Sequence, residues 1–532
     1  MEAFAALLDR LVVTPQRNGK LQLIADYCRS TPDPDRGYAI AAITRDLDIP
    51  SVKPAMLRSL MAERMDEALF KLSYEYVGDL AETISLAWPG KRGANRTPPL
   101  SEIVESLQQA SRMEGPALVE HFLDVLDPPG RWALLKLATG GMRIGVSARL
   151  AKLALAQFGD RHVNEIEELW HGLSPPYAAL FAWLEGRTEK PVNAAAAPFR
   201  PVMLAHALDE EKDLPAISPD LHIAEWKWDG VRVQAAAEDG ERRLYSRTGD
   251  DIGPAFPDIL AAMDFDVAID GELLIFNPEA EGYSVRPFGD LQQRLNRKTV
   301  SKKMLRSHPA FIRAYDLLKL GEEDLRALPF AERRTRLEQF FADHNPQRFD
   351  LSPLVAFDDQ DHLRGLRAAP PSDAIEGLML KKKSALYVAG HPKGEWWKWK
   401  RDPYLIDAVM MYAQRGHGRR SSFYSDFTFG VWRDGEIVPV GKAYFGFTDE
   451  ELKQLDKFVR DNTTDRFGPV RQVRFDENFG LVLEIAFEGL NRSPRHKSGV
   501  AMRFPRIHRI RWDKPAREAD RLETLETMLP SK

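Results

Sequence analysis

The spacing of hydrophobic positions changes along the chain near residue 200. Before that point, apolar residues recur every three or four positions, as in Phe4, Leu7, Leu8 and Leu11, which is the period of one helix face. After it, short apolar runs are separated by Gly and Pro, a pattern typical of strands joined by turns. This change predicts an all-α N-terminal region, residues 1–195, followed by regions that contain sheet.

The second region is predicted to be an α+β domain over residues 200–404. It follows residues 187–203, RTEKPVNAAAAPFRPVM, whose prolines and alanines are typical of a linker. Residues 324–341 have helical spacing. The strand candidates are HIAEWK, VRVQAAA, RRLYSR, VAIDGELLIF, FIRAYDLL, EGLMLKK and EWWKWKR. Because both patterns occur in one stretch, we expect helices and strands in a shared core.

The third region, residues 405–532, is predicted to be a small β-barrel. Its strand candidates are IDAVMMYAQ, FTFGVWR, EIVPVGKAYFG, VRQVRF and LVLEIAFE, with one helical stretch, residues 449–459, after the third. For a domain of this size an OB-fold is the economical choice, and periodicity alone does not distinguish it from another small β-domain. The predicted fold class is therefore multidomain, with an all-α domain, an α+β domain and an OB-fold domain.

The composition limits the partners and the compartment. Of 532 residues, 44% are hydrophobic and 29% are charged, and the formal net charge is −5. Contacts with nucleic acid would therefore depend on local basic patches, such as Lys381–Lys383 and Arg503–Arg511. One cysteine, Cys28, excludes intrachain disulfides and a Cys-rich metal site. Since neither a leader pattern nor a long apolar run is present, the chain is interpreted as cytoplasmic and not membrane-bound.

The segment Glu225–Gln234, EWKWDGVRVQ, holds a candidate nucleophile. Its Asp-Gly pair between two alternating segments predicts a hairpin, with Lys227 at a strand end. A lysine amine has a reference pKa of about 10.4 and attacks only when neutral, so activation needs burial or a cationic neighbour. Arg232 is the cation that the sequence offers, and it also suits phosphate binding. The alternative interpretation is an ordinary hairpin with an exposed lysine.

Further segments carry groups that a nucleotide-transfer site needs. In VAIDGELLIF, Asp270 and Glu272 share one strand face because side chains alternate. In EWWKWKR, the lysines share one face and the tryptophans share the other, so one face suits anions and the other suits a core. Taken singly, each group also has an ordinary structural explanation. The other candidates are Arg247 after a strand, the stacking ring of Tyr315, Glu376 in an apolar strand, and Lys398 and Lys400.

The run TGGMRIGVS is a candidate phosphate-binding turn in the helical region. Gly140 and Gly141 break one helix, and Ser147 is a suitable N-cap for the next. Arg143 and Arg149 lie close to that helix N-terminus, where backbone N–H groups favour an anion. A plain interhelical turn is an equally good explanation of the glycines alone.

The order of these motifs resembles that of a known family. KWDGVR, SRTGDD, DGE, RAYD, EG, WKWK and RFPR follow one another as in the ATP-dependent DNA ligases, members of the covalent nucleotidyltransferase superfamily. TGGMRIGVS, RPVMLA, PFGDLQQRLNRK and GVAMRFPRIHRIRWDK are also similar to ligase segments. The resemblance extends from about residue 130 to residue 514. It implies that the all-α domain binds DNA and that the α+β domain is the adenylation domain.

The resemblance implies sealing of nicks in duplex DNA by a monomer, in the service of DNA replication, repair or recombination. Lys227 would attack the α-phosphate of ATP, release pyrophosphate and form lysyl-AMP. AMP would pass to the 5′-phosphate of the nick, and the 3′-hydroxyl would displace it. ATP is then a substrate, and Mg²⁺ or Mn²⁺ is the implied metal.

Roles for individual residues follow from the same resemblance. Glu225 would contact adenine through its backbone or neighbourhood, Tyr315 would stack on the base, and Glu272 would hold the ribose. Arg232 and Arg247 would bind the nucleotide and nick phosphates, and Glu272 and Glu376 would bind the metal. Lys398 and Lys400 would contact the α-phosphate, and Arg503 and Arg506 would contact pyrophosphate. Arg143 and Arg149 would bind DNA.

One position departs from the family pattern. Many ligases have an arginine shortly before the paired lysines, whereas this chain has His391 and Lys393 there. That nucleotide contact is therefore left unassigned. The alternative functions are an RNA ligase, a capping-type nucleotidyltransferase, or a nucleic-acid-binding module without catalysis.

Overall fold

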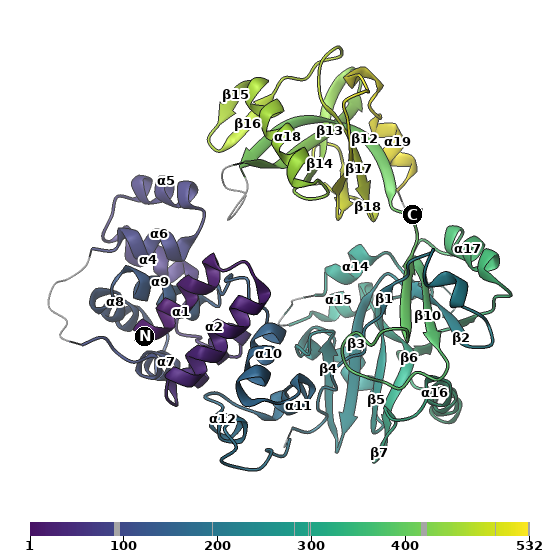
Figure 1. Ribbon diagram of the computed structural model, residues 1–532, viewed down its shortest axis with the longest axis horizontal. Coiled ribbons are helices and arrows are strands. Elements are labelled where there is room, and N and C mark those ends of the chain that lie inside the picture. Colours follow the sequence, from purple (N-terminus) through teal and green to yellow (C-terminus); the bar gives the residue numbers. More distant parts are fainter. Residues whose placement is uncertain are drawn as a thin grey trace. The chain divides into compact units, whose positions relative to one another are not determined.

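The computed structural model describes residues 1–89, 96–193, 195–280, 282–295, 297, 299–415, 423–494 and 496–529 (Figure 1). The chain forms two compact units. One contains Met1–Met203, Gln234–Asp251 and Asp264–Ala268, and the other contains Leu204–Val233, Ile252–Met263 and Ile269–Lys532. Positions 296 and 298 of the PFGDLQQRLNRK motif lie outside the described residues. In the part of the chain that is described, no helix has both the length and the apolar character needed to cross a membrane.

The N-terminal region is helical, which confirms the prediction made from its hydrophobic spacing. Phe4, Leu7, Leu8 and Leu11 are buried on one face of the first helix and join a core that these helices share. The helices are α1 (Glu2–Val13), α2 (Arg17–Ser30), α3 (Asp35–Thr44), α4 (Pro54–Ala62), α5 (Glu67–Val77), α6 (Leu80–Ala87), α7 (Leu100–Gln109), α8 (Gly115–Val125), α9 (Pro128–Thr139), α10 (Ala148–Gly159), α11 (Val163–Leu169), η1 (Trp170–Gly172) and α12 (Ala178–Leu184).

The loop between α9 and α10 has the predicted ends. Gly140 terminates α9 in the left-handed conformation, with φ 66°. Ser147 caps α10, because its hydroxyl accepts a hydrogen bond from the Leu150 amide at 3.2 Å. Lys20 on α2 holds the loop between these ends, since its Nζ donates to the carbonyl oxygen of Gly145 at 2.8 Å. Arg143 is exposed on this fixed loop.

The second half of the predicted linker is packed. Ala197 and Phe199 are buried, and the Tyr245 hydroxyl donates to the Ala197 carbonyl oxygen at 2.9 Å. The Gln234 side chain accepts from the Arg200 amide at 2.6 Å and donates to the Arg200 carbonyl oxygen at 2.9 Å. The proline and alanine content correctly indicated a break in regular structure. It did not indicate exposure, because small apolar side chains also pack closely.

A five-stranded sheet carries Lys227. Its order is β1 (His206–Ala207), β11 (Trp396–Lys400), β10 (Ile375–Lys382), β2 (His222–Trp228) and β9 (Leu354–Val355). In the antiparallel pair of β2 and β10, Gly377 lies opposite Lys227 and Met379 lies opposite Glu225. Side chains alternate along a strand, so Lys227 and Glu225, two positions apart on β2, project to the same face. The other face packs in an apolar cluster that contains Leu363, Leu378, Leu380, Trp397 and Trp399.

The second sheet of this region supplies further site residues. Its order is β4 (Glu241–Ser246), β3 (Val231–Glu238), β5 (Val267–Ile275), β6 (Ala310–Leu320) and β7 (Glu323–Asp324), with β8 (Phe349–Leu351) beside β6. The helices and short turns are η2 (Leu214–Ala216), η3 (Gly253–Ala255), α13 (Pro257–Ala262), α14 (Phe288–Gln292), α15 (Lys302–Ser307), α16 (Phe330–His344) and α17 (Gln360–Ala368). The helix predicted to begin at 324 begins at Phe330, because Pro329 occupies the N-cap position.

The C-terminal region is rich in β-structure. Strands β14 (Glu436–Ala443), β13 (Tyr424–Arg433), β12 (Tyr404–Arg415), β16 (Val470–Val473) and β15 (Thr463–Phe467) are neighbours, and β17 (Val482–Phe487) pairs with β12 and with β20 (Arg506–Arg511). A separate hairpin joins β18 (Gly489–Arg492) and β19 (Val500–Arg503). The helices are α18 (Asp449–Asp461), η5 (Ala516–Glu518) and α19 (Leu522–Thr527).

The five predicted C-terminal strands and the predicted helix are present. Thr448 and Glu451 form a capping box that fixes the start of α18. Sequence reasoning missed β15, β18, β19 and β20. β15 and β20 carry polar or charged residues at most positions, and β18 and β19 are only four residues long, so alternation does not mark these strands.

A β-bulge places Glu376 on the face of Lys227. The register between β10 and β2 shifts between Ile375, opposite Trp228, and Gly377, opposite Lys227. One residue, Glu376, is therefore extra on its strand, and a bulge redirects the side chain of such a residue. Gly377 next to it has φ 147°, a conformation that L side chains rarely adopt.

Replacing Gly377 with alanine is expected to destabilise the protein by about 3 kcal/mol. A Cβ at this position would collide with the carbonyl oxygen of Trp399 on β11, and the backbone conformation would be strained as well. Urea unfolding of Gly377→Ala measures the effect, with Gly365→Ala on α17 as the control, because a Cβ there meets open space. Equal stability of the two variants would contradict the close approach.

Candidate active site

Lys227 is the last but one residue of β2, and its amine is in contact with an acid. Its Nζ donates to Glu376 Oε2 at 2.6 Å. Burial alone would lower the pKa of the Lys227 amine, but the carboxylates of Glu376 and Glu272 outweigh burial and raise it. Burial acts to raise the pKa of Glu376, but Lys227 and its other cationic neighbours lower it to about 2. The pair is therefore an ammonium and a carboxylate at neutral pH.

The prediction that the charge of Arg232 lowers the pKa of Lys227 is wrong. The Arg232 Nε donates to Asp270 Oδ1 at 3.1 Å, and its Nη2 donates to the Tyr387 hydroxyl at 3.1 Å. Tyr387 in turn donates to Asp270 Oδ2 at 2.6 Å. Because Asp270 is fully buried against the guanidinium, it offsets the charge of Arg232 locally.

Two further acids crowd the lysine. Burial raises the pKa of Glu272 to about 8, against the opposing effect of Lys227 and Arg232. Burial also raises the pKa of Asp229, in the turn after β2, although Arg503 acts in the other direction. Such shifts are typical of sites where acids are held close together for a function.

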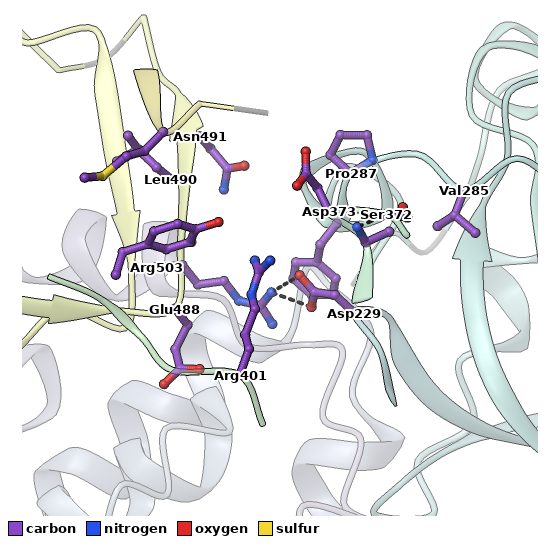
Figure 2. Close-up of a pocket in the computed structure, with 15 residues that line it drawn as sticks. Asp229, Val285, Pro287, Ser372, Asp373, Arg401, Glu488, Leu490, Asn491 and Arg503 are labelled. Atoms are coloured by element: carbon purple, nitrogen blue, oxygen red, sulfur yellow. Dashed lines mark hydrogen bonds and ion pairs between the residues drawn. The ribbon is translucent and has the colours of Figure 1, made fainter. Parts of the chain in front are cut away.

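Cations from the C-terminal region meet these acids. Figure 2 shows the guanidinium of Arg503 directed at the Asp229 carboxylate, with which its Nη1 forms an ion pair. A second nitrogen of Arg503 lies 3.6 Å from Glu376 Oε1. Glu488 accepts from Lys400 at 3.3 Å and from Arg506 at 2.9 Å. Three of the predicted phosphate-binding cations, Lys400, Arg503 and Arg506, are thus paired with acids.

A pocket of about 340 Å³ lies at these contacts (Figure 2). Asp229, Phe288, Arg401, Glu488 and Arg503 line it together with neighbouring residues. The guanidinium of Arg503 lies over the Phe288 ring at 4.3 Å from its centroid. Charged groups of both signs therefore line the pocket.

The predicted base-binding residues lie on the two sheets. Tyr315 is half-buried on β6, with Lys381 Nζ 4.5 Å from its ring centroid. The Glu225 carboxylate is buried, with Lys381 and Arg334 as its ion-pair partners. The Glu225 side chain is thus engaged within the protein, and the predicted contact through its backbone or neighbourhood stays a prediction.

Other predicted residues are placed as follows. Lys398 is half-buried and lies opposite Met379, which puts it on the face of Lys227. Arg247 is exposed in the turn after β4, in the unit that contains the helical region. His391 and Lys393 are both exposed. The predicted roles of these residues stay predictions.

Arg143 and Arg149 differ in their surroundings. Arg143 lines a hollow of about 600 Å³ next to the N-terminus of α10, with Arg17, Lys20 and Arg45 among the other lining residues. Arg149 instead lies 3.2 Å from Glu167, a buried acid. The electrostatic surroundings therefore favour an anion at Arg143 over Arg149.

Sequence reasoning did not assign Asp229, Glu488 or Tyr387 to the site. The Asp-Gly pair marks Asp229 as a turn residue, and its place two positions after Lys227 is the signal that it lies near the amine. Glu488 and Tyr387 had no local signal, because their partners are distant in sequence: Arg506 and Lys400 for the first, Asp270 and Arg232 for the second.

Trp228, for which the sequence suggested no role, supports the turn after Lys227. The guanidinium of Arg313 lies over its ring at 4.1 Å, and Arg313 Nη2 donates to Asp350 at 2.6 Å. This stack fixes the end of β2 next to the nucleophile.

Comparison with known proteins identifies the family. The model described as "ATP dependent DNA ligase domain" matches residues 202–400, and that described as "ATP dependent DNA ligase C terminal region" matches residues 420–514. A "Probable DNA ligase" of Koribacter versatilis is 29% identical, over 100% of this chain and 97% of that protein. "DNA ligase 1" of Korarchaeum cryptofilum is also 29% identical, over 98% of this chain and 97% of that protein.

The chain belongs to the ATP-dependent DNA ligases. The fold of this ligase is similar to the solved structure Pmar-Lig_PreS3, with a TM-score of 0.58 and 15% identity, over 96% of this chain and 99% of that one. The ligase is therefore an enzyme that uses ATP to join DNA. The RNA-ligase, capping and non-catalytic alternatives are not favoured.

Proposed function

We propose that this ligase seals nicks in duplex DNA, as a monomer, with Lys227 as the covalent carrier of AMP. The observation that carries the proposal is the half-buried Lys227 amine, held 2.6 Å from Glu376 among carboxylates, two residues before Asp229, which lines the pocket. A new bond forms between Lys227 Nζ and the α-phosphorus of ATP, while the bond from that phosphorus to the pyrophosphate oxygen breaks. In the second step AMP is transferred from Lys227 to the 5′-phosphate of the nick. In the third step the 3′-hydroxyl attacks that phosphate and displaces AMP.

The ammonium of Lys227 must lose a proton before it attacks. Glu376 Oε2 is in hydrogen-bond contact with the amine, and Lys227 and the other cations hold the pKa of Glu376 well below its usual range, so the proton passes on to solvent. Glu376 therefore orients the amine toward the α-phosphate.

A divalent metal fits the carboxylates beside the lysine. Among the described residues, no group of three or more His, Cys, Asp or Glu side chains converges as a ready metal site. Mg²⁺, however, is commonly held by one or two carboxylates, with water and substrate phosphates completing its shell. Glu272 and Glu376 would hold Mg²⁺ or Mn²⁺ in this way. The metal would supply positive charge beside the phosphate that reacts.

The remaining residues bind and orient ATP. Lys398 and Lys400 neutralise charge at the α-phosphate, and Arg503 and Arg506 orient pyrophosphate. Tyr315 stacks on adenine, Glu272 holds the ribose, and Glu225 lies in the neighbourhood of adenine. Arg232 and Arg247 bind phosphates of the nucleotide and the nick. Lys400, Arg503 and Arg506 must each exchange an acidic partner for phosphate, since each forms an ion pair in the protein.

Three domains divide the work. Residues 1–195 are the DNA-binding domain, residues 200–404 are the adenylation domain, and residues 405–532 are an OB-fold domain. The hollow beside α10 supports the first assignment, because it combines a helix N-terminus with several cationic side chains.

Replacing Arg143 with alanine is expected to weaken nicked-DNA binding more than replacing Arg149. Arg143 faces the cationic hollow, whereas Arg149 is paired with Glu167. The slope of log affinity against log salt should fall by about 1 for Arg143→Ala. Fluorescence anisotropy of a labelled nicked duplex at several salt concentrations measures both variants. A larger effect at Arg149 would refute the assignment.

Sealing of a singly nicked duplex tests the proposed function. The ligase with ATP and Mg²⁺ should convert the nicked strand to full length and release AMP and pyrophosphate. The same duplex with an RNA strand at the nick should be a poorer substrate. Preference for the RNA nick, or sealing without nucleotide, would contradict the proposal.

A further inference from the structure

A buried charge cluster lies beside the proposed adenine site. The side chains of Glu225, Lys381 and Arg334 are only 2%, 2% and 5% exposed. Glu225 Oε2 forms an ion pair with Lys381 Nζ, and Glu225 Oε1 lies 3.3 Å from Arg334 Nη1. Apolar side chains of similar size would often be as stable in such a place. Stability alone therefore does not account for the cluster.

Lys381 connects this cluster to the predicted stacking ring. Its Nζ lies 4.5 Å from the ring centroid of Tyr315, 4.6 Å from that of Phe330 and 4.7 Å from that of Trp396. An ammonium among three aromatic faces is held by their quadrupoles. The same ammonium pairs with Glu225, so a single side chain fixes both the ring and the carboxylate.

Arg334 anchors the cluster to α16. Its Nε donates to Glu338 at 2.7 Å, one turn along the helix, while its Nη1 meets Glu225. Glu225 lies on β2 and shares the face of Lys227, whereas Lys381 lies on the adjacent β10. Two strands and a helix are thereby tied together two residues from the nucleophile.

The Glu225 carboxylate can accept a further hydrogen bond. Its Oε2 is buried in an ion pair with Lys381 Nζ, and each carboxylate oxygen has a second lone pair. A carboxylate only accepts hydrogen bonds. The six-position of adenine carries an amine donor, whereas that of guanine carries an oxygen acceptor. A carboxylate held near this edge would therefore favour adenine.

We propose that Lys381 and Arg334 are positioning residues for nucleotide selection: they hold the Glu225 carboxylate and the Tyr315 ring so that ATP is accepted and GTP is rejected. This inference rests on the proposed function, in which Lys227 becomes adenylated.

The test uses Lys381→Met and Arg334→Met in the full chain. Lysyl-nucleotide formation is followed with α-labelled ATP and with α-labelled GTP over a range of concentrations. For each variant, KM for ATP should rise roughly tenfold, the size of one lost desolvated cation–π or ion-pair contact, with kcat changed much less. The preference for ATP over GTP should fall. Lys381→Arg should restore part of it.

Lys382→Met is the matched control. This neighbouring lysine is 40% exposed, and its Nζ is 3.9 Å from Glu395, so its loss should change neither KM nor preference. Wild-type KM and preference in folded Lys381→Met would overturn the inference.

Glu225→Gln provides a second variant if Lys381→Met does not fold. Its amide keeps the shape of the side chain but can also donate a hydrogen bond to guanine, so the preference for ATP should fall. An unchanged preference would overturn the inference. Absence of label on the unaltered protein with either nucleotide would refute the Lys227 assignment itself.

Discussion

Replacing Lys227 with alanine is expected to abolish the covalent adenylate. The variant lacks the amine that bonds to the α-phosphorus, so formation of the protein–AMP adduct should fall by about 10⁶-fold, as when other covalent enzymes lose their nucleophile. Incubation with α-labelled ATP and Mg²⁺, followed by denaturing electrophoresis, measures the adduct. Retained label on Lys227→Ala would show that another residue is the carrier.

A pre-adenylated nick separates the loss of the nucleophile from a loss of folding. The last step needs only the DNA adenylate and the 3′-hydroxyl, so Lys227→Ala should still seal a nick that already carries AMP on its 5′-phosphate. The matched control is Lys382→Met, a lysine on β10 outside the proposed site, which should form the adduct normally. Failure of Lys227→Ala to seal the pre-adenylated nick would mean that the lysine also has a role after adenylation.

Replacing Glu376 with glutamine is expected to slow adenylation by about 10²-fold or more, since a 1 Å loss of alignment at a reacting group can cost that much. The glutamine keeps the shape of the side chain but loses the charge that holds the Lys227 amine at 2.6 Å. It also removes one of the two proposed metal carboxylates. Single-turnover formation of lysyl-AMP measures the change.

The pH dependence of the same step gives an independent readout. Burial lowers the pKa of Lys227, and the carboxylates of Glu376 and Glu272 raise it by more. Only the neutral amine attacks, so the wild-type rate should increase with pH through the neutral range. Without the Glu376 charge, the pKa of Lys227 should fall, and the profile should move to lower pH. Glu395→Gln is the control, because Glu395 contacts Lys382 and not Lys227.

An unaltered rate and pH profile in Glu376→Gln would mean that the carboxylate neither aligns the Lys227 amine nor raises its pKa. A slower rate with an unaltered profile would restrict the role of Glu376 to alignment or metal binding.

The sequence predicted the parts of this molecule that repeat with a regular period or match a family motif. Residue period separated the helical region from the sheets, and alternation placed Trp397 and Trp399 in a core opposite Lys398. Gly140 and Ser147 correctly predicted where α9 ends and where α10 begins. These features depend on neighbours within a few positions, which is the range that a single sequence reveals.

Features that depend on distant partners were not predictable. The offsetting of Arg232 by Asp270 requires two strands to lie side by side, 38 positions apart in sequence. The pairing of Asp229 with Arg503 joins residues 274 positions apart. The bulge at Glu376 is a shift in register, and only Gly377 next to it hinted at unusual backbone. The ionisation state of Lys227 depends on all of these contacts, so its predicted activation by Arg232 was wrong.

The ion pairs around Lys227 make the entry of ATP an exchange of partners. Four acids and four bases meet there: Asp229, Glu272, Glu376 and Glu488, with Lys227, Lys400, Arg503 and Arg506. The cations are therefore already in contact with acids before any nucleotide binds. A triphosphate that arrives alone would have to displace carboxylates from their cations, whereas one that arrives with a divalent cation offers each side a replacement. Nucleotide and metal should therefore bind cooperatively, each weakly without the other.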